Sequence, residues 1–254
     1  MEIEKYLYAM KKRCSRRKYT NRPIDSKCVK ELEDNIALYN RESGLNMKLL
    51  IGNGGELFNG FRKSYGLFVG VRNYIAMIGG KDLPNRMEKV GRFGEKIILE
   101  ATAMGLSTCW VGTSYDKKTA MALCKENDTL DCVIAIGYSD KKHSLKEQMM
   151  EYGMHRQNKS KETLKEAEEP VPEWFLQGMD AVHLAPTARN LRPFVFKYKD
   201  GQVTAFITNP TETAMIDLGI AKLHFELGAG GGSWEYGNGG HYYFDSKRKE
   251  NDKQ

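Results

Sequence analysis

The 254-residue sequence lacks several features, and each absence excludes a class of protein. No apolar run approaches the length of a membrane span. The N-terminus, MEIEKYLYAMKKR, has neither the apolar core nor the small-residue cleavage site of a signal peptide. These absences predict a cytoplasmic protein. The five cysteines form no CxxC pair, and an odd count does not suit a disulfide framework, so we expect reduced thiols.

Several patterns of catalysis and metal binding are also missing. Histidines and cysteines never fall at zinc-ligand spacing, so no metal site is predicted. Neither a G-x-S-x-G motif nor a pair of catalytic carboxylates occurs. The glycines of ELGAGGGSW approach G-x-G-x-x-G, but Ser233 stands at the last position. They also follow a predicted helix, whereas the dinucleotide fingerprint follows a strand.

The composition is typical of a soluble globular protein. Hydrophobic residues make up 41% and charged residues 28% of the sequence. The chain is also long enough to form a buried hydrophobic core. The net charge of +6 is too small to indicate a nucleic-acid partner, but it suits an anionic small ligand such as a phosphate. We therefore expect small-molecule partners, no nucleic acid and no membrane.

Hydrophobic periodicity predicts helices and strands that alternate along the chain. The predicted helices are 1–12, 26–39, 88–105, 116–127, 173–184 and 211–227. The predicted strands are 47–52, 73–80, 131–138, the run FVFKYKDGQVTAFIT and a last one near HYYF. Asp200-Gly201 predicts a tight hairpin turn inside that run.

The order of elements restarts after a charge-dense stretch, which indicates an internal repeat. KCVKELEDNIALYNRESGLNMKLL and EWFLQGMDAVHLAPTARNLRPFVF align without a gap, and KVGRFGEKIILEA resembles DLGIAKLHFELGA. We interpret this as a degenerate duplication. The predicted organisation is an N-terminal half (1–138), a charged connector (139–172), a C-terminal half (173–245) and a tail (246–254).

The turn RCSRR is the first candidate binding segment. Arg13, Ser15 and Arg17 occupy alternate positions, and alternate side chains of an extended chain point the same way. Two guanidinium forks and a hydroxyl then form a receptor for a phosphate. Taken alone, the same residues are also typical of a solvated basic loop.

The stretch APTARNLRPF is the second candidate. Pro186 and Pro193 stiffen the backbone on either side of Thr187, Asn190 and Arg192, so these side chains have little entropy left to lose on binding. The amide of Asn offers a donor and an acceptor, which suits the edge of a heterocycle. The alternative is a helix end followed by an ordinary loop.

The segment GLSTCWVGTS is the third candidate. Trp110 stands beside Val111 and Gly112, where exposed backbone amides next to an aromatic ring could line a planar ligand. The alternative is a buried tryptophan that anchors the preceding helix.

These three segments resemble the flavin-binding motifs of the nitroreductase family of FMN enzymes. In R-R-S-x-R-x-[FY] the chain matches Arg13, Ser15, Arg17 and Tyr19, and Cys14 departs. In A-P-S-x-x-N-x-Q-P-W it matches Ala185, Pro186, Asn190 and Pro193, while Thr187, Arg192 and Phe194 stand for Ser, Gln and Trp. In G-L-G-T-x-W-[IV]-G it matches Gly105, Leu106, Thr108, Trp110, Val111 and Gly112.

Each half of the chain lacks the motif that the other half keeps. The first half has YNRESGLNMK where A-P-S-x-x-N belongs, and the second has EEPVPEWF where R-R-S-x-R belongs. The chain thus resembles the fused, single-chain branch of the family. The resemblance implies an α+β fold with a mixed, mainly antiparallel sheet flanked by helices, two pseudo-symmetric halves, one composite FMN site and a functional monomer.

The resemblance also implies a basic residue near the flavin phosphate after the strand DCVIAIGY. Arg156 and Lys159 are in the right place, although a solvated helix face explains them equally well. The full set of implied FMN-binding residues is Arg13, Cys14, Ser15, Arg17, Trp110, Val111, Gly112, Arg156, Lys159, Pro186, Thr187, Asn190 and Arg192.

The implied activity is FMN-dependent oxidoreduction. NAD(P)H would hand a hydride to flavin N5, and a flat, electron-poor acceptor such as a nitroaromatic or a quinone would then take it. No side chain is named as a catalytic acid or base, because the flavin carries the chemistry. We also hypothesise that Arg192, in place of Gln, raises the flavin potential. Two alternatives stay open: a flavin-binding protein without turnover, and a basic nucleotide-binding module.

Overall fold

The computed structural model describes residues 2–59, 66–140, 142–144, 147–149, 160–168 and 170–244. The chain divides into two compact units. We call Lys12–Arg86 with Lys96–Gly153 the central unit, and Met1–Lys11 with Met87–Glu95 and Met154–Gln254 the terminal unit. Both units are discontinuous in sequence, so each is completed by chain segments that lie far apart along the polypeptide.

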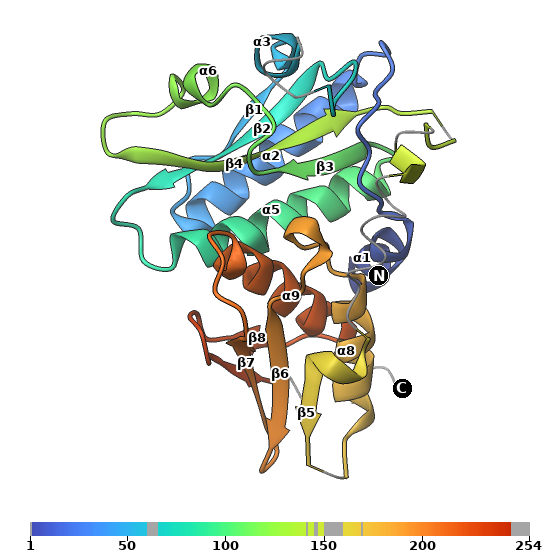
Figure 1. The fold of residues 1–254 in the computed structure, drawn as a ribbon, viewed down its shortest axis with the longest axis vertical. Helices are drawn as coiled ribbons and strands as arrows, with labels where there is room; N and C mark the ends of the chain where they lie inside the picture. The colour runs from blue at the N-terminus through green and yellow to red at the C-terminus, as the bar shows by residue number, and fades with distance from the viewer. Residues whose placement is uncertain are drawn as a thin grey trace. The chain divides into compact units, whose positions relative to one another are not determined.

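The central unit contains a four-stranded antiparallel sheet. Its order is β1 (Lys48–Leu50), β2 (Asn73–Gly80), β4 (Asp128–Gly137) and β3 (Ser107–Val111). Alternate residues of β2, β3 and β4 form one apolar face of the sheet, because successive side chains of a strand point to opposite faces. This face packs against α3 (Gly54–Phe58) and α6 (Lys117–Met121), while α2 (Ser26–Ser43) lies along the other face (Figure 1).

The terminal unit contains a five-stranded mixed sheet. Its order is β5 (Lys165–Ala167), β6 (Phe194–Lys199), β7 (Gln202–Ile207), β9 (His241–Tyr243) and β8 (Ser233–Trp234). Only the β5–β6 pair is parallel. The β6–β7 turn has positive φ at Asp200 (50°) and Gly201 (77°), as a two-residue hairpin turn requires.

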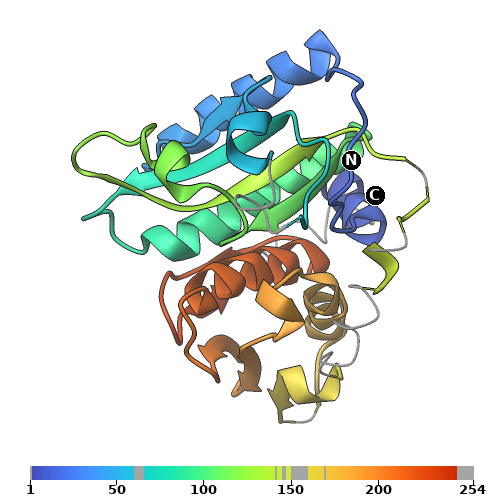
Figure 2. The ribbon, with the colours of Figure 1, turned by 45° about the horizontal axis from the view of Figure 1, so that its top comes forward.

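Helices α8 (Glu173–Leu184) and α9 (Ala214–Gly228) lie together on one side of this sheet, as Figures 1 and 2 show. Phe175 of α8, Phe196 of β6 and Phe225 of α9 meet in the core, and the rings of Phe196 and Phe225 are stacked with centroids 5.2 Å apart. The unit also includes α1 (Glu2–Lys12), except for its last residue, and the short 3₁₀ turns η1 (Glu162–Leu164) and η2 (Ala188–Asn190). Aromatic packing therefore supplies much of this core.

Residues Met87–Glu95 of α5 (Arg86–Ala103) pack against α9 with almost no side chain between the two backbones. A Cβ atom on Gly91 would lie 2.0 Å from the Ile216 carbonyl oxygen, and one on Gly219 would lie 2.1 Å from that of Glu88. Both positions therefore require glycine. Ion pairs flank the crossing: Lys222 to Glu88 at 2.6 Å, Arg92 to Glu226 at 2.8 Å, and His224 to Glu95 at 3.0 Å.

The predicted fold class is confirmed, and most predicted elements are present. The helix predicted over 173–184 and the strand over 73–80 have those bounds in the structure. The helix predicted over 116–127 was too long, because α6 ends at Met121. The following i→i+3 bonds, such as Cys124 N–H to Met121 O at 3.0 Å, tighten the chain into a turn before β4. Across the part of the chain described, no helix is both long and apolar enough to cross a bilayer.

Candidate functional site

The segment Arg13–Tyr19, here called the basic segment, runs along β3, one of the two edge strands of the central sheet. Ser15 forms a parallel bridge to Thr108, and the Arg16 N–H donates to the Thr108 carbonyl at 3.0 Å. Further along, the Tyr19 N–H donates to the Val69 carbonyl at 2.9 Å, and its hydroxyl donates to the Ala135 carbonyl at 3.2 Å. The segment is therefore held in the extended form that gives alternate side chains a common face.

Three of the predicted phosphate ligands act on the pKa of one buried thiol, Cys109 of β3. Burial raises the pKa of Cys109, and the charge of Arg17, a hydrogen bond from Ser15 and the charge of Arg13 oppose that rise. The alternation of the sequence thus brings these three residues together. Cys109 itself was not among the predicted site residues.

Arg16, at the position between Ser15 and Arg17, has its side chain on the opposite face of the segment. It is only 5% exposed, and its Nε donates to Glu147 Oε1 at 3.2 Å. Its Nη1 and Nη2 donate to the backbone carbonyls of Asp140 at 2.7 Å and Lys142 at 3.2 Å. Arg16 is therefore a structural residue that ties the basic segment to the chain after β4.

Glu147 holds the backbone of the basic segment. Its Oε1 accepts from the N–H groups of Arg17 at 2.7 Å and Lys18 at 3.2 Å, and its Oε2 accepts from the N–H and hydroxyl of Ser144 at 2.8 and 2.9 Å. Burial alone would raise the pKa of Glu147, but these bonds and the one from Arg16 lower it to about 2. Sequence reasoning missed Glu147, although the pattern Ser144-x-x-Glu147 is that of a capping box.

The guanidinium of Arg17 stands out in this segment. The residue is half-buried, yet its side chain makes no hydrogen bond or ion pair within the part of the chain that the structure describes. A charged fork in this position, with Arg13 and Ser15 beside the same thiol, is suited to bind an anion.

The remaining candidates in the central unit have different environments. Trp110 is half-buried on β3, whereas the side chain of Val111 is only 3% exposed and belongs to the core. Val111 could therefore address a ligand only through its backbone. Gly112 is exposed, and a Cβ there would meet nothing within 4 Å. Cys14 Sγ lies 3.5 Å from Nε2 of His143.

In the terminal unit, the residues from Pro186 to Pro193 form the proline-flanked turn. Three of its residues, Arg189 (φ 52°), Asn190 (φ 58°) and Arg192 (φ 45°), have left-handed backbone conformations. Such conformations are uncommon outside glycine, cost energy and cluster at ligand-binding sites. The sequence predicted candidate ligands in this turn, but it did not predict the left-handed backbone of these three residues.

One carboxylate and one hydroxyl hold the proline-flanked turn. Asp217 of α9 accepts from the Ala188 N–H at 2.9 Å, and Thr187 Oγ1 accepts from the Arg192 N–H at 3.2 Å. Asp217 is only 3% exposed. Burial raises the pKa of Asp217 to about 6, although the bonds from Ala188 and Thr213 act in the opposite direction. No local pattern in the sequence indicates Asp217.

Arg192 points to the end of α8. The residue is 5% exposed, its Nη2 donates to the His183 carbonyl at 2.7 Å, and its Nη1 lies 3.3 Å from His183 Nδ1. Burial lowers the pKa of Arg192, and burial together with the Arg192 charge lowers the pKa of His183. A role of Arg192 beside a flavin would require its side chain to turn away from His183. Arg156 and Lys159 lie outside the described residues.

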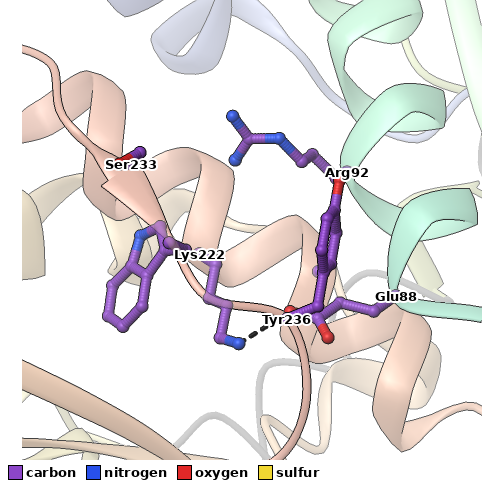
Figure 3. A pocket seen from close by; sticks show the side chains of 7 residues that line it. Glu88, Arg92, Lys222, Ser233 and Tyr236 are labelled. Atoms are coloured by element: carbon purple, nitrogen blue, oxygen red, sulfur yellow. Dashed lines mark hydrogen bonds and ion pairs between the residues drawn. The ribbon is translucent and has the colours of Figure 1, made fainter. Parts of the chain in front are cut away.

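A separate cavity of about 90 Å³ lies in the terminal unit beside the α5–α9 crossing (Figure 3). Its buried Lys222 donates to Glu88 and to the carbonyls of Glu235 and Gly237, at 2.6, 3.0 and 2.8 Å. All three ammonium protons are therefore used within the fold. Burial lowers the pKa of Lys222, and Glu88 opposes that change. We assign this cluster a structural role.

Comparisons with known proteins identify a family that the chain matches. The family model described as "Putative TM nitroreductase" matches residues 5–229. A crystal structure of a "putative nitroreductase" from Thermotoga maritima covers 93% of this chain and 91% of its own, with 20% identity and a TM-score of 0.62, which shows a common fold. No curated protein is significantly similar to this sequence.

Two further solved structures are less similar. An FMN-dependent nitroreductase from Clostridium difficile matches 54% of this chain and 90% of its own, with 20% identity and a TM-score of 0.45. A "Putative NADH Oxidase" from Clostridium acetobutylicum matches 53% and 89%, with 19% identity and a TM-score of 0.43.

Proposed function

Because the chain belongs to this nitroreductase family over residues 5–229, we propose that it is an FMN-dependent oxidoreductase of the cytoplasm. It would take reducing equivalents from NAD(P)H and pass them to a flat, electron-poor acceptor such as a nitroaromatic or a quinone. The observation that carries this proposal is the half-buried guanidinium of Arg17, which has no partner within the described part of the chain. The phosphate of FMN is an anion of the kind that such a group binds.

The two segments described above support the proposed binding of FMN. Arg13, Ser15 and Arg17 would hold the phosphate and ribityl end, because all three act on the pKa of the same thiol, Cys109. Thr187 and Asn190, in a strained and pre-organised turn, would address the ring system. Trp110, the Gly112 backbone, Arg156 and Lys159 complete the proposed set. When bound, FMN would supply the hydride-transfer chemistry, and the protein would supply orientation and electrostatics.

We also propose that residues 1–138 and 173–245 are the two halves of a pseudo-dimer that share one composite site in a functional monomer. The α5–α9 crossing supports this interpretation. Gly219 and Ile216 each follow their counterparts Gly91 and Glu88 by 128 positions. Gly91 meets the backbone of Ile216, and Gly219 meets that of Glu88. Reciprocal contacts of this kind are the signature of a two-fold interface.

FMN binding to the full-length protein tests the proposal. The protein is mixed with excess FMN, desalted, and its bound flavin is measured by visible absorbance. We expect about one FMN per chain, the stoichiometry of one shared site. Two per chain would contradict the composite site, and none would contradict the function. Bound FMN without NAD(P)H oxidation would instead indicate a flavin-binding protein without turnover.

A variant pair tests the role of Arg17. Arg17→Gln is expected to weaken FMN binding by about tenfold or more, because a charge-assisted bond to phosphate contributes about 1.5–3 kcal/mol. Riboflavin has no phosphate, so its affinity should be unchanged. Arg22→Gln is the matched control, since Arg22 is exposed and paired with Asp25 at 2.9 Å. Equal losses for FMN and riboflavin would contradict phosphate binding by Arg17.

A further inference from the structure

We propose that Cys14 is a site of reversible thiol modification, where a small anionic disulfide forms a mixed disulfide with the protein and His143 carries the proton. The pair is long-range: Cys14 Sγ and His143 Nε2 are 3.5 Å apart although 129 positions separate the residues. Both residues are half-buried, so the thiol is within reach of a small reagent. A nucleophile and a base in contact form the arrangement that activates a thiol.

The fold fixes the position of this pair. Arg16, two residues from Cys14, donates to the carbonyls of Asp140 at 2.7 Å and Lys142 at 3.2 Å. These two bonds hold the chain that carries His143 against the basic segment. The carbonyl of His143 in turn accepts from Gln148 Nε2 at 2.9 Å. The contact is therefore part of a bonded framework.

The other cysteines lack these features. Cys109 and Cys132 are buried, while Cys28 and Cys124 are half-buried like Cys14. Within the described part of the chain, neither Cys28 nor Cys124 has a histidine within hydrogen-bonding distance. Burial raises the pKa of the Cys124 thiol, and the nearby Asp128 raises it further. Cys14 is thus the thiol that this structure singles out.

The exchange step balances without a further oxidant. His143 Nε2 accepts the thiol proton, and the Cys14 thiolate attacks one sulfur of the disulfide. A new S–S bond forms as the original one breaks, and the departing thiolate takes the proton from His143. One disulfide is consumed and one thiol is released. The arginines of the basic segment, Arg13 and Arg17, would attract an anionic reagent.

The consequence for flavin rests on the proposed function. Cys14 lies between Arg13 and Ser15, which we assign to the FMN phosphate, but its side chain meets His143 on the opposite face of the extended segment. A negatively charged cap on its sulfur would therefore act on the phosphate through like charge and not by filling its place. Modification of Cys14 would weaken FMN binding, and bound FMN would slow modification by an anionic reagent. Reduction of the mixed disulfide would restore binding.

The modification site is tested on the flavin-free protein with 5,5′-dithiobis(2-nitrobenzoate), an anionic disulfide whose released thiol is coloured. We expect one fast-reacting thiol per chain. It should disappear in Cys14→Ser, persist in Cys28→Ser, and react about tenfold more slowly in His143→Gln, because the group that accepts the thiol proton is lost. Misfolding of a variant would add fast thiols and so cannot imitate the loss. A fast thiol that survives in Cys14→Ser, or an unchanged rate in His143→Gln, would overturn the proposal.

The flavin consequence is tested separately by adding FMN before the reagent. Slower modification of Cys14, with riboflavin protecting less than FMN, would support repulsion between the cap and the FMN phosphate. A protein that retains FMN but whose Cys14 reacts at the same rate would overturn that repulsion, while the modification site would stand. Because the first test needs no flavin, a failure of FMN binding would be distinguished from a failure of the thiol site.

Discussion

The basic segment and the proline-flanked turn are both held by one buried carboxylate, but the two carboxylates behave in opposite ways. Glu147 accepts from two backbone N–H groups of the basic segment, from Arg16 and from Ser144, and its pKa is lowered to about 2. Among the described residues, Asp217 accepts from Ala188 and Thr213, and its pKa is raised to about 6. The number and charge of the donors therefore decide whether burial is offset.

The two segments also differ in their backbone. The basic segment is extended and bonded to neighbouring strands, whereas the proline-flanked turn has three left-handed residues other than glycine. One segment is positioned by an electrostatic network and the other by a strained backbone. The following experiments test whether this contrast holds.

Loss of the Glu147 carboxylate should have the largest effect. Glu147→Ala leaves the charge of Arg16 buried and removes the acceptor of two N–H groups. We expect the free energy of unfolding to fall by about 3–5 kcal/mol, the cost of an unpaired buried charge. Urea unfolding followed by circular dichroism measures it. Glu126→Ala, at an exposed side chain, is the control. A loss below about 1 kcal/mol would contradict the role of Glu147.

Asp217→Asn should change how stability depends on pH. A raised pKa means that the folded protein holds this proton more tightly than the unfolded chain. Wild-type stability should therefore fall by up to about 3 kcal/mol as pH rises from about 4 to 6. Asn keeps an acceptor for the Ala188 N–H but has no proton to lose, so the variant should lack this fall.

The measurement for Asp217 is urea unfolding of both proteins at several pH values. The free energy of unfolding of Asp217→Asn minus that of the wild type should increase as pH rises to about 6, the pKa of Asp217, and should then stay constant. Asp180→Asn, at a carboxylate 67% exposed, should show no such pattern. Glu147 acts in the opposite direction: its lowered pKa adds stability that is lost as pH falls toward 2. Parallel curves for wild type and Asp217→Asn would contradict the raised pKa.

Removal of the Arg192 side chain should alter His183. The Arg192 charge lowers the pKa of His183, second only to burial, so Arg192→Ala should raise that pKa. NMR titration of the imidazole measures the change. Arg189→Ala is the matched control, because Arg189 lies in the same turn but is exposed. An unchanged His183 titration would show that the Arg192–His183 contact does not persist in solution.

Glycine substitutions should give the smallest effects, with opposite signs in the two segments. Arg189→Gly relieves a left-handed residue, so we expect neutral or slightly increased stability, up to about 1 kcal/mol. Lys18→Gly, at an exposed residue of the extended segment, should lower stability by about 0.5–1 kcal/mol. Thermal unfolding compares them. Equal losses in both variants would contradict the difference in backbone strain.

The sequence predicted what depends on neighbouring residues. The bounds of α8 and β2 follow from local periodicity, and the Asp200–Gly201 turn follows from the residue types at its two positions. Alternation in the basic segment also brought Arg13, Ser15 and Arg17 around one thiol. Even α6, predicted too long, was correct in type and position.

Contacts between distant parts of the chain could not be predicted in the same way. Arg16 meets Glu147 across 131 positions, and Asp217 reaches Ala188 across 29. No local pattern encodes such pairs, since they exist only after the chain has folded. The contact of Arg192 with His183 was missed for a related reason. Its orientation depends on the left-handed turn between the two residues, which no glycine marks.

The glycine crossing of α5 and α9 also has a consequence in time. Gly219 is synthesised 128 residues after Gly91. At a translation rate of about 5–20 residues per second, α5 is therefore synthesised roughly 6–26 s before the α9 residue that it packs against. During that interval the α9 of a neighbouring nascent chain could take its place, which is the route to a domain-swapped dimer. We expect the dimer fraction on size-exclusion chromatography to rise with expression rate. The yield of chains in which α5 pairs with its own α9 would then depend on how closely one chain follows another from the ribosome.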